Sequence, residues 1–234
     1  LSTGRRITAC VPVNCLGHPA RVEEIRQVCD LYNIKVIEDA AESLGSWRAS
    51  VHTGLKGHIG TLSFNGNKII TTGGGGALVT NDEELAQKAR HLSTPAKRTH
   101  EWEFFHDDVG FNYRLPNINA ALGCAQILKI AVFLDRKRDN AKRYAAWASD
   151  WKVEIVSEPP ESSSNFWLNA VLLPDRLARD KILAVTNQHR VMTRPLWTPL
   201  TNLPMYRNCF SSGHSISDDI FNRLVCLPSS AIQR

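Results

Sequence analysis

Residues 6–39 alternate between two short apolar runs and one helical stretch. The run RITACVPV at 6–13 is rich in β-branched and apolar residues and predicts a strand, and KVIED at 35–39 predicts another. Between them, residues 20–33 carry an apolar side chain at every third position, and Pro19 precedes this helical pattern. Because a strand-helix-strand unit of this kind joins parallel strands of one sheet, the sequence predicts an α/β fold.

The same alternation continues to about residue 130. Strands are expected at 59–64 and 76–80, and a helix at 82–92, with Asn81 or Asp82 as its cap. A long polar and aromatic loop follows at 93–113, and loops of that length in a folded domain are usually functional or mobile. We therefore expect residues 1–130 to form a large domain with a mainly parallel sheet and flanking helices.

The remaining residues predict a smaller unit. A long helical region runs from 117 to 148 and leads into strand-like segments at 151–157 and 166–173, with the loop EPPESSS between them. A helix is expected at 176–190. The order strand, strand, helix is typical of a small α+β domain, so residues 131–234 are expected to form a linking helix and a small C-terminal domain.

Composition argues against several classes of partner. The sequence shows no apolar run near the ~18 residues of a membrane span and no basic-then-apolar leader. Its six cysteines are scattered and form no CxxC pair, which is typical of free thiols in a reducing cytoplasm and not of a metal site. The net charge of +5 includes the run DRKRDNAKR, which we interpret as a solvated helix face, because no nucleic-acid motif accompanies it. We expect a cytoplasmic protein without membrane, nucleic-acid or metal partners.

Lys68 lies between two turn-forming stretches and is followed by the glycines at 73–76. A lysine amine can form a Schiff base with an aldehyde cofactor and then carry a proton. Most loop lysines, however, are simply solvent-exposed, and a glycine run serves a tight turn as readily as a ligand. Neither a Walker motif nor GxGxxG can be written over this stretch.

Asp39 and Ser63 each end a predicted strand. Ligands of open parallel sheets bind beyond such ends, where Asp39 could pair with a protonated ring nitrogen and Ser63 could donate to a phosphate. Asp39 could equally cap a helix, and Ser63 could bond its own backbone. Pyridoxal phosphate requires an acid, a hydroxyl donor and an amine, so these two residues together with Lys68 suggest that cofactor.

Longer sequence segments point to one specific protein family. The segments VIEDAAESLGS (36–46), GTLSFNGNKIITTGGGGALVTND (60–82) and VGFNYRLPNINAALGCAQ (109–126) resemble hallmark blocks of the DegT/DnrJ/EryC1/StrS sugar aminotransferases. The segment RVMTRPLWTPLTNLPMY (190–206) resembles the branch that acts on nucleotide-linked amino sugars for bacillosamine or legionaminic acid. The resemblance covers essentially the whole chain and implies part of a fold-type-I pyridoxal-phosphate transferase.

The resemblance implies roles for five residues around the cofactor. Lys68 would bond to the cofactor aldehyde and shuttle the proton, and Asp39 would hold the pyridine nitrogen protonated. Ala41 would pack against one ring face, and Glu42, where many relatives carry His or Gln, would lie near the ring hydroxyl. Ser63 would bind the phosphate.

Two further roles follow from the same resemblance. Asn112 would reach the phosphate of the other subunit's cofactor, which implies a homodimer with shared sites, and Arg194 would contact substrate. The dehydratase branch of the family carries histidine at the position of Lys68, so transamination is favoured over dehydration. The implied reaction moves an amino group, from glutamate, to a nucleotide-linked 4-keto-6-deoxy sugar for surface polysaccharide or glycan synthesis.

Family members extend upstream of RITACVPV and beyond the last residues here. The upstream part carries the opening helix whose N-terminus cradles the phosphate, and an aromatic residue that stacks on the ring. We therefore expect a truncated cofactor site, in a fragment of a longer enzyme or in a gene product that cannot catalyse. The alternative function is a non-catalytic scaffold or interaction module, against which the presence of Lys68, Asp39 and Ser63 argues.

Overall fold

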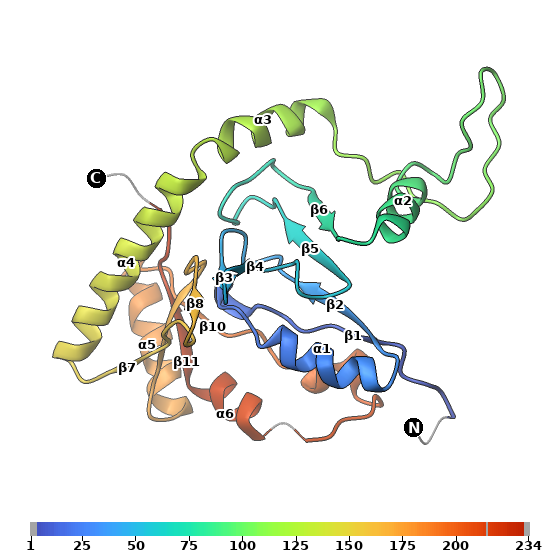
Figure 1. Cartoon of the computed structure of the whole chain (residues 1–234). Coiled ribbons are helices and arrows are strands. Elements are labelled where there is room, and N and C mark those ends of the chain that lie inside the picture. Colours follow the sequence, from blue (N-terminus) through green and yellow to red (C-terminus); the bar gives the residue numbers. More distant parts are fainter. Residues whose placement is uncertain (1–3, 214, 232–234) are drawn as a thin grey trace. The chain divides into compact units, whose positions relative to one another are not determined.

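The computed structural model describes residues 4–213 and 215–231, and the chain divides into two units (Figure 1). The first unit comprises the residues up to Asp135 together with Glu158–Trp167. The second unit comprises Arg136–Ser157 and the residues from Leu168 onward. The first unit contains two sheets and the second unit contains one, among the described residues.

One sheet of the first unit has the order β1-β2-β5-β6. Its strands are β1 (Ala9–Cys10), β2 (Lys35–Asp39), β5 (Ile59–Ser63) and β6 (Gly76–Val79). The first three are parallel neighbours and β6 is antiparallel to β5, so the expected mainly parallel sheet is confirmed. Register places Asp39 opposite Thr61, so the carboxyl ends of β2 and β5 lie at one edge of the sheet.

The strand expected at 6–13 is shorter than predicted. Only Ala9–Cys10 pairs as a strand, and Val13 adds one isolated bridge to Asp39. Between them lies Pro12, which has no N–H to donate. Its carbonyl nevertheless accepts from the Asp39 N–H at 2.9 Å. The proline therefore interrupts the ladder without detaching the segment from β2.

Two helices accompany this sheet close to where the sequence predicts them. Helix α1 (Val22–Leu31) contributes Val22 and Cys29 to a core cluster with Val36 of β2. Helix α2 (Glu83–Leu92) begins after Asp82, whose carboxylate accepts from the Leu85 N–H at 3.0 Å. Asp82, and not Asn81, is thus the cap.

A second, three-stranded antiparallel sheet in the first unit has the order β4-β3-β8. Its strands are β3 (Trp47–Arg48), β4 (Val51–His52) and β8 (Ser162–Ser163). The segment at 158–164 was expected to be a loop, and β8 shows that this was incomplete. Its pairing partner, β3, lies more than a hundred residues earlier, a relation that local sequence patterns do not contain. A short 3-10 turn, η1 (Cys15–Gly17), also belongs to this unit.

The long loop at 93–113 carries no regular strand or helix, in line with expectation. Lys97 and His106 form one isolated bridge within it, and Figure 1 shows the loop projecting from the end of α2. Cations lie over its aromatic rings, with Lys97 Nζ 3.9 Å from the Phe104 centroid.

The helical region expected at 117–148 is two helices, α3 (Asn117–Ile127) and α4 (Ile130–Asp150). They meet at a bend of 61°. Of the helices in the described residues, none is by itself long and apolar enough to cross a membrane. Only α3 and α4 taken together across their bend reach that length and composition.

The second unit is an α+β arrangement. Its antiparallel sheet has the order β10-β11-β9-β7, with β7 (Glu154–Ile155), β9 (Asn169–Leu172), β10 (Arg194–Pro195) and β11 (Leu224–Leu227). The helices are α5 (Arg176–Gln188) and α6 (Ser215–Arg223), and two 3-10 turns are η2 (Leu200–Asn202) and η3 (Pro204–Tyr206). Strands β7 and β9 fall inside the segments predicted at 151–157 and 166–173.

The burial of Lys137 on α4 predicts a pH-dependent stability for the second unit. It is 6% exposed, its ammonium donates to the Ser229 carbonyl, and burial lowers its pKa from 10.5 to about 8. Between these values the unfolded chain binds more protons than the folded chain. The free energy of unfolding should therefore rise with pH across this window, by up to about 3 kcal/mol.

Urea denaturation at about pH 8 and about pH 10.5 measures this rise. Lys137→Met should remove it, because the variant has no ammonium to desolvate. Lys142→Met on the same helix is the matched control, since the Lys142 side chain is 79% exposed. Equal pH slopes in wild type and Lys137→Met would contradict the prediction.

Candidate active site

Lys68 follows β5 in a loop that folds back on itself. Its N–H donates to the Asn65 carbonyl at 3.0 Å, and the Phe64 N–H and carbonyl bond to Gly75 and Thr72, each at 2.9 Å. Gly75 has a φ of +101°, and a side chain there would meet Leu115 at 2.6 Å. The glycine run therefore serves the turn and its close packing.

The amine of Lys68 lies in a partly desolvated setting. Its Nζ is 4.1 Å from the centroid of the Trp167 ring. Burial lowers the pKa of Lys68, while the carboxylates of Glu42 and Asp39 act in the opposite direction. The neutral amine is thus accessible at lower pH than in a solvated lysine, and two carboxylates stand within electrostatic range of the charged form.

Asp39 ends β2 at the carboxyl edge of the sheet. Its Oδ1 accepts from the Ala41 N–H at 3.0 Å and from the Thr61 hydroxyl at 3.5 Å. No helix begins after it, since the following residues form turns. Asp39 therefore stabilises a turn and does not cap a helix, and its Oδ1 accepts from the turn after β2 and from β5.

Glu42 lies in the same turn and is anchored by a backbone N–H. Its Oε2 accepts from the Leu16 N–H at 2.8 Å. Burial raises the pKa of Glu42, and the Leu16 hydrogen bond and the Lys68 charge lower it. The same turn carries Ala41, which is half-buried.

Ser63 lies at the end of β5, one strand from Asp39. Its Oγ accepts from the Asn65 N–H at 3.3 Å, which is the backbone role that the sequence left open. A hydroxyl that accepts in this way can still donate its own hydrogen to a phosphate.

The other two predicted residues, Asn112 and Arg194, come from other segments of the chain. Asn112 is exposed in the segment that follows the long loop. Arg194 belongs to the second unit, where its guanidinium donates to the Asn187 side chain at 2.8 Å and to the Thr193 carbonyl at 2.9 Å. The first unit thus brings together Lys68, Asp39 and Glu42, with Ser63 at the same sheet edge.

Sequence reasoning missed Trp167 and Asn165. Trp167 is 4% exposed and Asn165 is fully buried, and both come from the segment that joins the first unit late in the chain. Neither residue belongs to a motif or a spacing that predicts a contact with Lys68.

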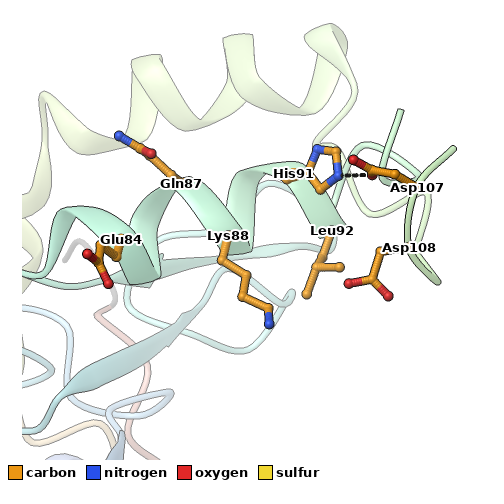
Figure 2. Close-up of a pocket in the computed structure, with 7 residues that line it drawn as sticks. All are labelled: Glu84, Gln87, Lys88, His91, Leu92, Asp107 and Asp108. Atoms are coloured by element: carbon orange, nitrogen blue, oxygen red, sulfur yellow. Dashed lines mark hydrogen bonds and ion pairs between the residues drawn. The ribbon is translucent and has the colours of Figure 1, made fainter. Parts of the chain in front are cut away.

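A cavity of about 440 Å³ lies on α2 and the long loop, and Figure 2 shows the seven residues that line it. His91 Nε2 and Asp107 Oδ1 are 2.6 Å apart there, and Arg98 Nε donates to Asp107 Oδ2 at 2.8 Å. Hydrogen bonds from Arg98 and His91 lower the pKa of Asp107 to about 2. None of the predicted site residues lines this cavity, so it forms no part of the candidate site.

Comparison with known proteins identifies the family of the chain. A family model described as the DegT/DnrJ/EryC1/StrS aminotransferase family matches residues 3–232. EpsN of Bacillus subtilis, described as a pyridoxal phosphate-dependent aminotransferase, is 39% identical over 228 residues, which are 95% of this chain and 58% of that protein. GDP-perosamine synthase of Escherichia coli O157:H7 is 34% identical over 221 residues, which are 94% of this chain and 60% of that protein.

A solved aminotransferase of the same family from Brucella abortus superposes with a TM-score of 0.89 at 26% identity, covering 98% of this chain and 61% of that one. The expected α/β fold is therefore confirmed. The chain spans about three fifths of the length of the relatives that it matches. On the family model and the shared fold together, the chain belongs to the DegT/DnrJ/EryC1/StrS aminotransferase family.

Proposed function

We propose that this chain carries the lysine-bearing site of a pyridoxal-phosphate-dependent aminotransferase of nucleotide sugars. The observation that carries the proposal is the partly buried Lys68 amine, packed over the Trp167 ring and within electrostatic range of the carboxylates of Glu42 and Asp39, next to the carboxyl edge of a parallel sheet. Membership of an aminotransferase family and similarity to a GDP-perosamine synthase support it.

The residues present fit the cofactor. The end of β2 supplies a carboxylate, which suits a ring nitrogen, and the end of β5 supplies a hydroxyl, which suits a phosphate. The loop after β5 supplies an amine, which suits an aldehyde. When bound, pyridoxal phosphate supplies an electron-accepting ring that lets an amino group pass between two carbons. The work of the chain is to hold that ring, to set its charge and to move a proton.

Lys68 and Asp39 carry the chemical roles. Because burial lowers its pKa, the Lys68 amine can be held unprotonated where it would hold the aldehyde of the cofactor, and it can carry a proton at Nζ. Asp39 Oδ1 is held by Ala41 and Thr61, and we assign Oδ2 to the ring nitrogen, where a carboxylate keeps that nitrogen protonated.

The remaining roles concern binding. We assign Ser63 to the phosphate, Ala41 to one ring face and Glu42 to the ring hydroxyl. Asn112 is proposed to reach the cofactor of a second subunit in a homodimer, which light scattering tests, since a strictly monomeric holoenzyme would overturn it. Arg194 is proposed to contact the sugar substrate.

We further propose glutamate as the amino donor and a nucleotide-linked 4-keto-6-deoxy sugar as the acceptor, in the bacillosamine and legionaminic-acid branch. In this scheme residues 1–130 bind the cofactor, and residues 131–234 supply the linking helix and the small domain. The lysine at position 68 favours transamination over dehydration, and the charged groups around it favour an enzyme over a scaffold.

Pyridoxal phosphate added to the purified chain tests the proposal. A visible absorption band, and a borohydride-trapped adduct located at Lys68 by peptide mass analysis, are expected. Glutamate-dependent amination of a GDP-linked 4-keto sugar, compared with a UDP-linked one, then tests the substrate class. Absence of both band and adduct would overturn the assignment of the chemistry to this chain.

A further inference from the structure

The indole of Trp167 contacts the turn of Lys68 although 100 residues separate Trp167 from Asn67 in sequence. Lys68 Nζ lies 4.1 Å from the ring centroid, and the indole Nε1 donates to the Asn67 carbonyl at 2.7 Å. The face of the ring thus meets the amine, while its N–H is tied to the residue before the lysine. A buried tryptophan needs a hydrogen-bond partner, and here that partner belongs to the turn that carries the lysine.

Asn165 holds this tryptophan in place. Its side-chain amide donates to the carbonyls of Glu42 and Leu44, both at 2.9 Å, and its Oδ1 accepts from the Trp167 N–H at 2.8 Å. The side chain therefore joins the backbone of Trp167 to the turn that carries Glu42, one of the carboxylates that act on Lys68. Breaking it would leave buried donors and acceptors without partners.

Gly17 packs closely against Asn165 and the backbone of Trp167. A side chain at Gly17 would come within 2.0 Å of Asn165 Oδ1 and 2.9 Å of the Trp167 backbone nitrogen, and Gly17 has a φ of +90°. The Gly17 carbonyl also accepts from the hydroxyls of Ser46 and Ser164, at 2.7 and 2.9 Å. The segment that carries Asn165 and Trp167 is thus both closely packed against Gly17 and hydrogen-bonded to it through Ser164.

We propose that Trp167 is a positioning residue whose indole face holds the Lys68 ammonium whenever the amine is not bonded to the cofactor, with Asn165 keeping the indole in place. The role in catalysis rests on the proposed function, because transamination requires the lysine to leave the cofactor and return. A free lysine chain has many rotamers, and a cation–π contact restricts them. The indole therefore keeps the amine within reach of the carbon that it must serve.

The test uses the full chain without cofactor. Trace acetic anhydride labels neutral amines, so the labelling of the Lys68 peptide between about pH 7 and about pH 11, read by mass spectrometry, gives the pKa of Lys68. Trp167→Leu removes the π face. We expect it to lower the Lys68 pKa by about 0.4–1.5, because the ammonium loses its cation–π partner. Trp167→Phe keeps a weaker ring face and should lower it by less.

The direction of the change separates this role from simple shielding. A tryptophan that only excludes water would, when removed, let the ammonium be solvated, and the pKa would rise. An unchanged or raised Lys68 pKa in folded Trp167→Leu would overturn the proposal. If circular dichroism shows that this variant does not fold, Trp167→Phe provides the test instead. An unchanged Lys68 pKa in Trp167→Phe would then overturn the proposal.

Trp151→Leu is the matched control, because Trp151 is 71% exposed and belongs to the second unit. It should leave the Lys68 pKa unaltered. The labelling needs no cofactor, so its outcome is independent of whether pyridoxal phosphate binds. A missing cofactor adduct with a lowered pKa in Trp167→Leu would sink the proposed function alone.

Discussion

Replacing Lys68 by alanine is expected to abolish the visible band formed with pyridoxal phosphate. It is also expected to lower the rate of glutamate-dependent amination by about 10²–10⁴-fold or more. The reason is chemical. In the proposed function, Lys68 would supply the amine that bonds to the cofactor, and the same amine would carry a proton. Absorption spectroscopy of the loaded variant and a stopped amination assay measure the two effects separately.

Lys88→Ala is the control for this prediction, because Lys88 is an exposed lysine on α2. It should retain both the band and the activity. Lys68→Arg adds a second comparison, since arginine keeps the positive charge near Glu42 and Asp39 but does not bond to the cofactor aldehyde. A visible band that persists in Lys68→Ala would remove Lys68 from its assigned role.

Replacing Glu38 by alanine is expected to lower the free energy of unfolding by about 2–6 kcal/mol. Glu38 is fully buried on β2, and its carboxylate accepts from the Asn14 side chain at 2.9 Å and from the Lys56 N–H at 3.0 Å. Removing it leaves these buried donors unsatisfied, at about 1–3 kcal/mol each. Urea denaturation of the variant and of the wild type measures the difference.

Glu101→Ala serves as the control, because Glu101 is exposed on the long loop and should change stability by no more than about 0.5 kcal/mol. Glu38→Gln keeps the volume and one acceptor oxygen and should cost less than Glu38→Ala. A loss below about 1 kcal/mol in Glu38→Ala would mean that water or a rearranged loop satisfies the donors. Because side chains alternate along a strand, Glu38 points away from the face of Asp39, so this effect is on stability and not on the site.

Local patterns were sufficient for several elements. The predicted strand at 35–39 coincides with β2, and the helices predicted at 20–33 and 82–92 contain α1 and α2. These segments have strong periodicity and clear boundary residues, such as the cap Asp82. The long helix was predicted without its 61° bend, because the stretch around the bend contains no proline and reads as continuously helical.

The candidate site was predicted in part for the same reason. Asp39 and Ser63 end strands that the sequence identifies, and parallel neighbours in one sheet place such ends at a common edge. Their alternative local roles needed coordinates, which show Asp39 stabilising a turn through Ala41 and Ser63 accepting from Asn65.

The sequence by itself determined the α/β class, the positions of Asp39, Ser63 and Lys68 at strand ends or just beyond them, and the family resemblance, because each depends on residues close together along the chain. Only the tertiary structure decided what surrounds Lys68. Trp167 reaches it through the pairing of β8 with β3 and through the buried amide of Asn165. Contacts between segments a hundred residues apart arise from packing and hydrogen bonding in three dimensions, and no periodicity along the chain records them.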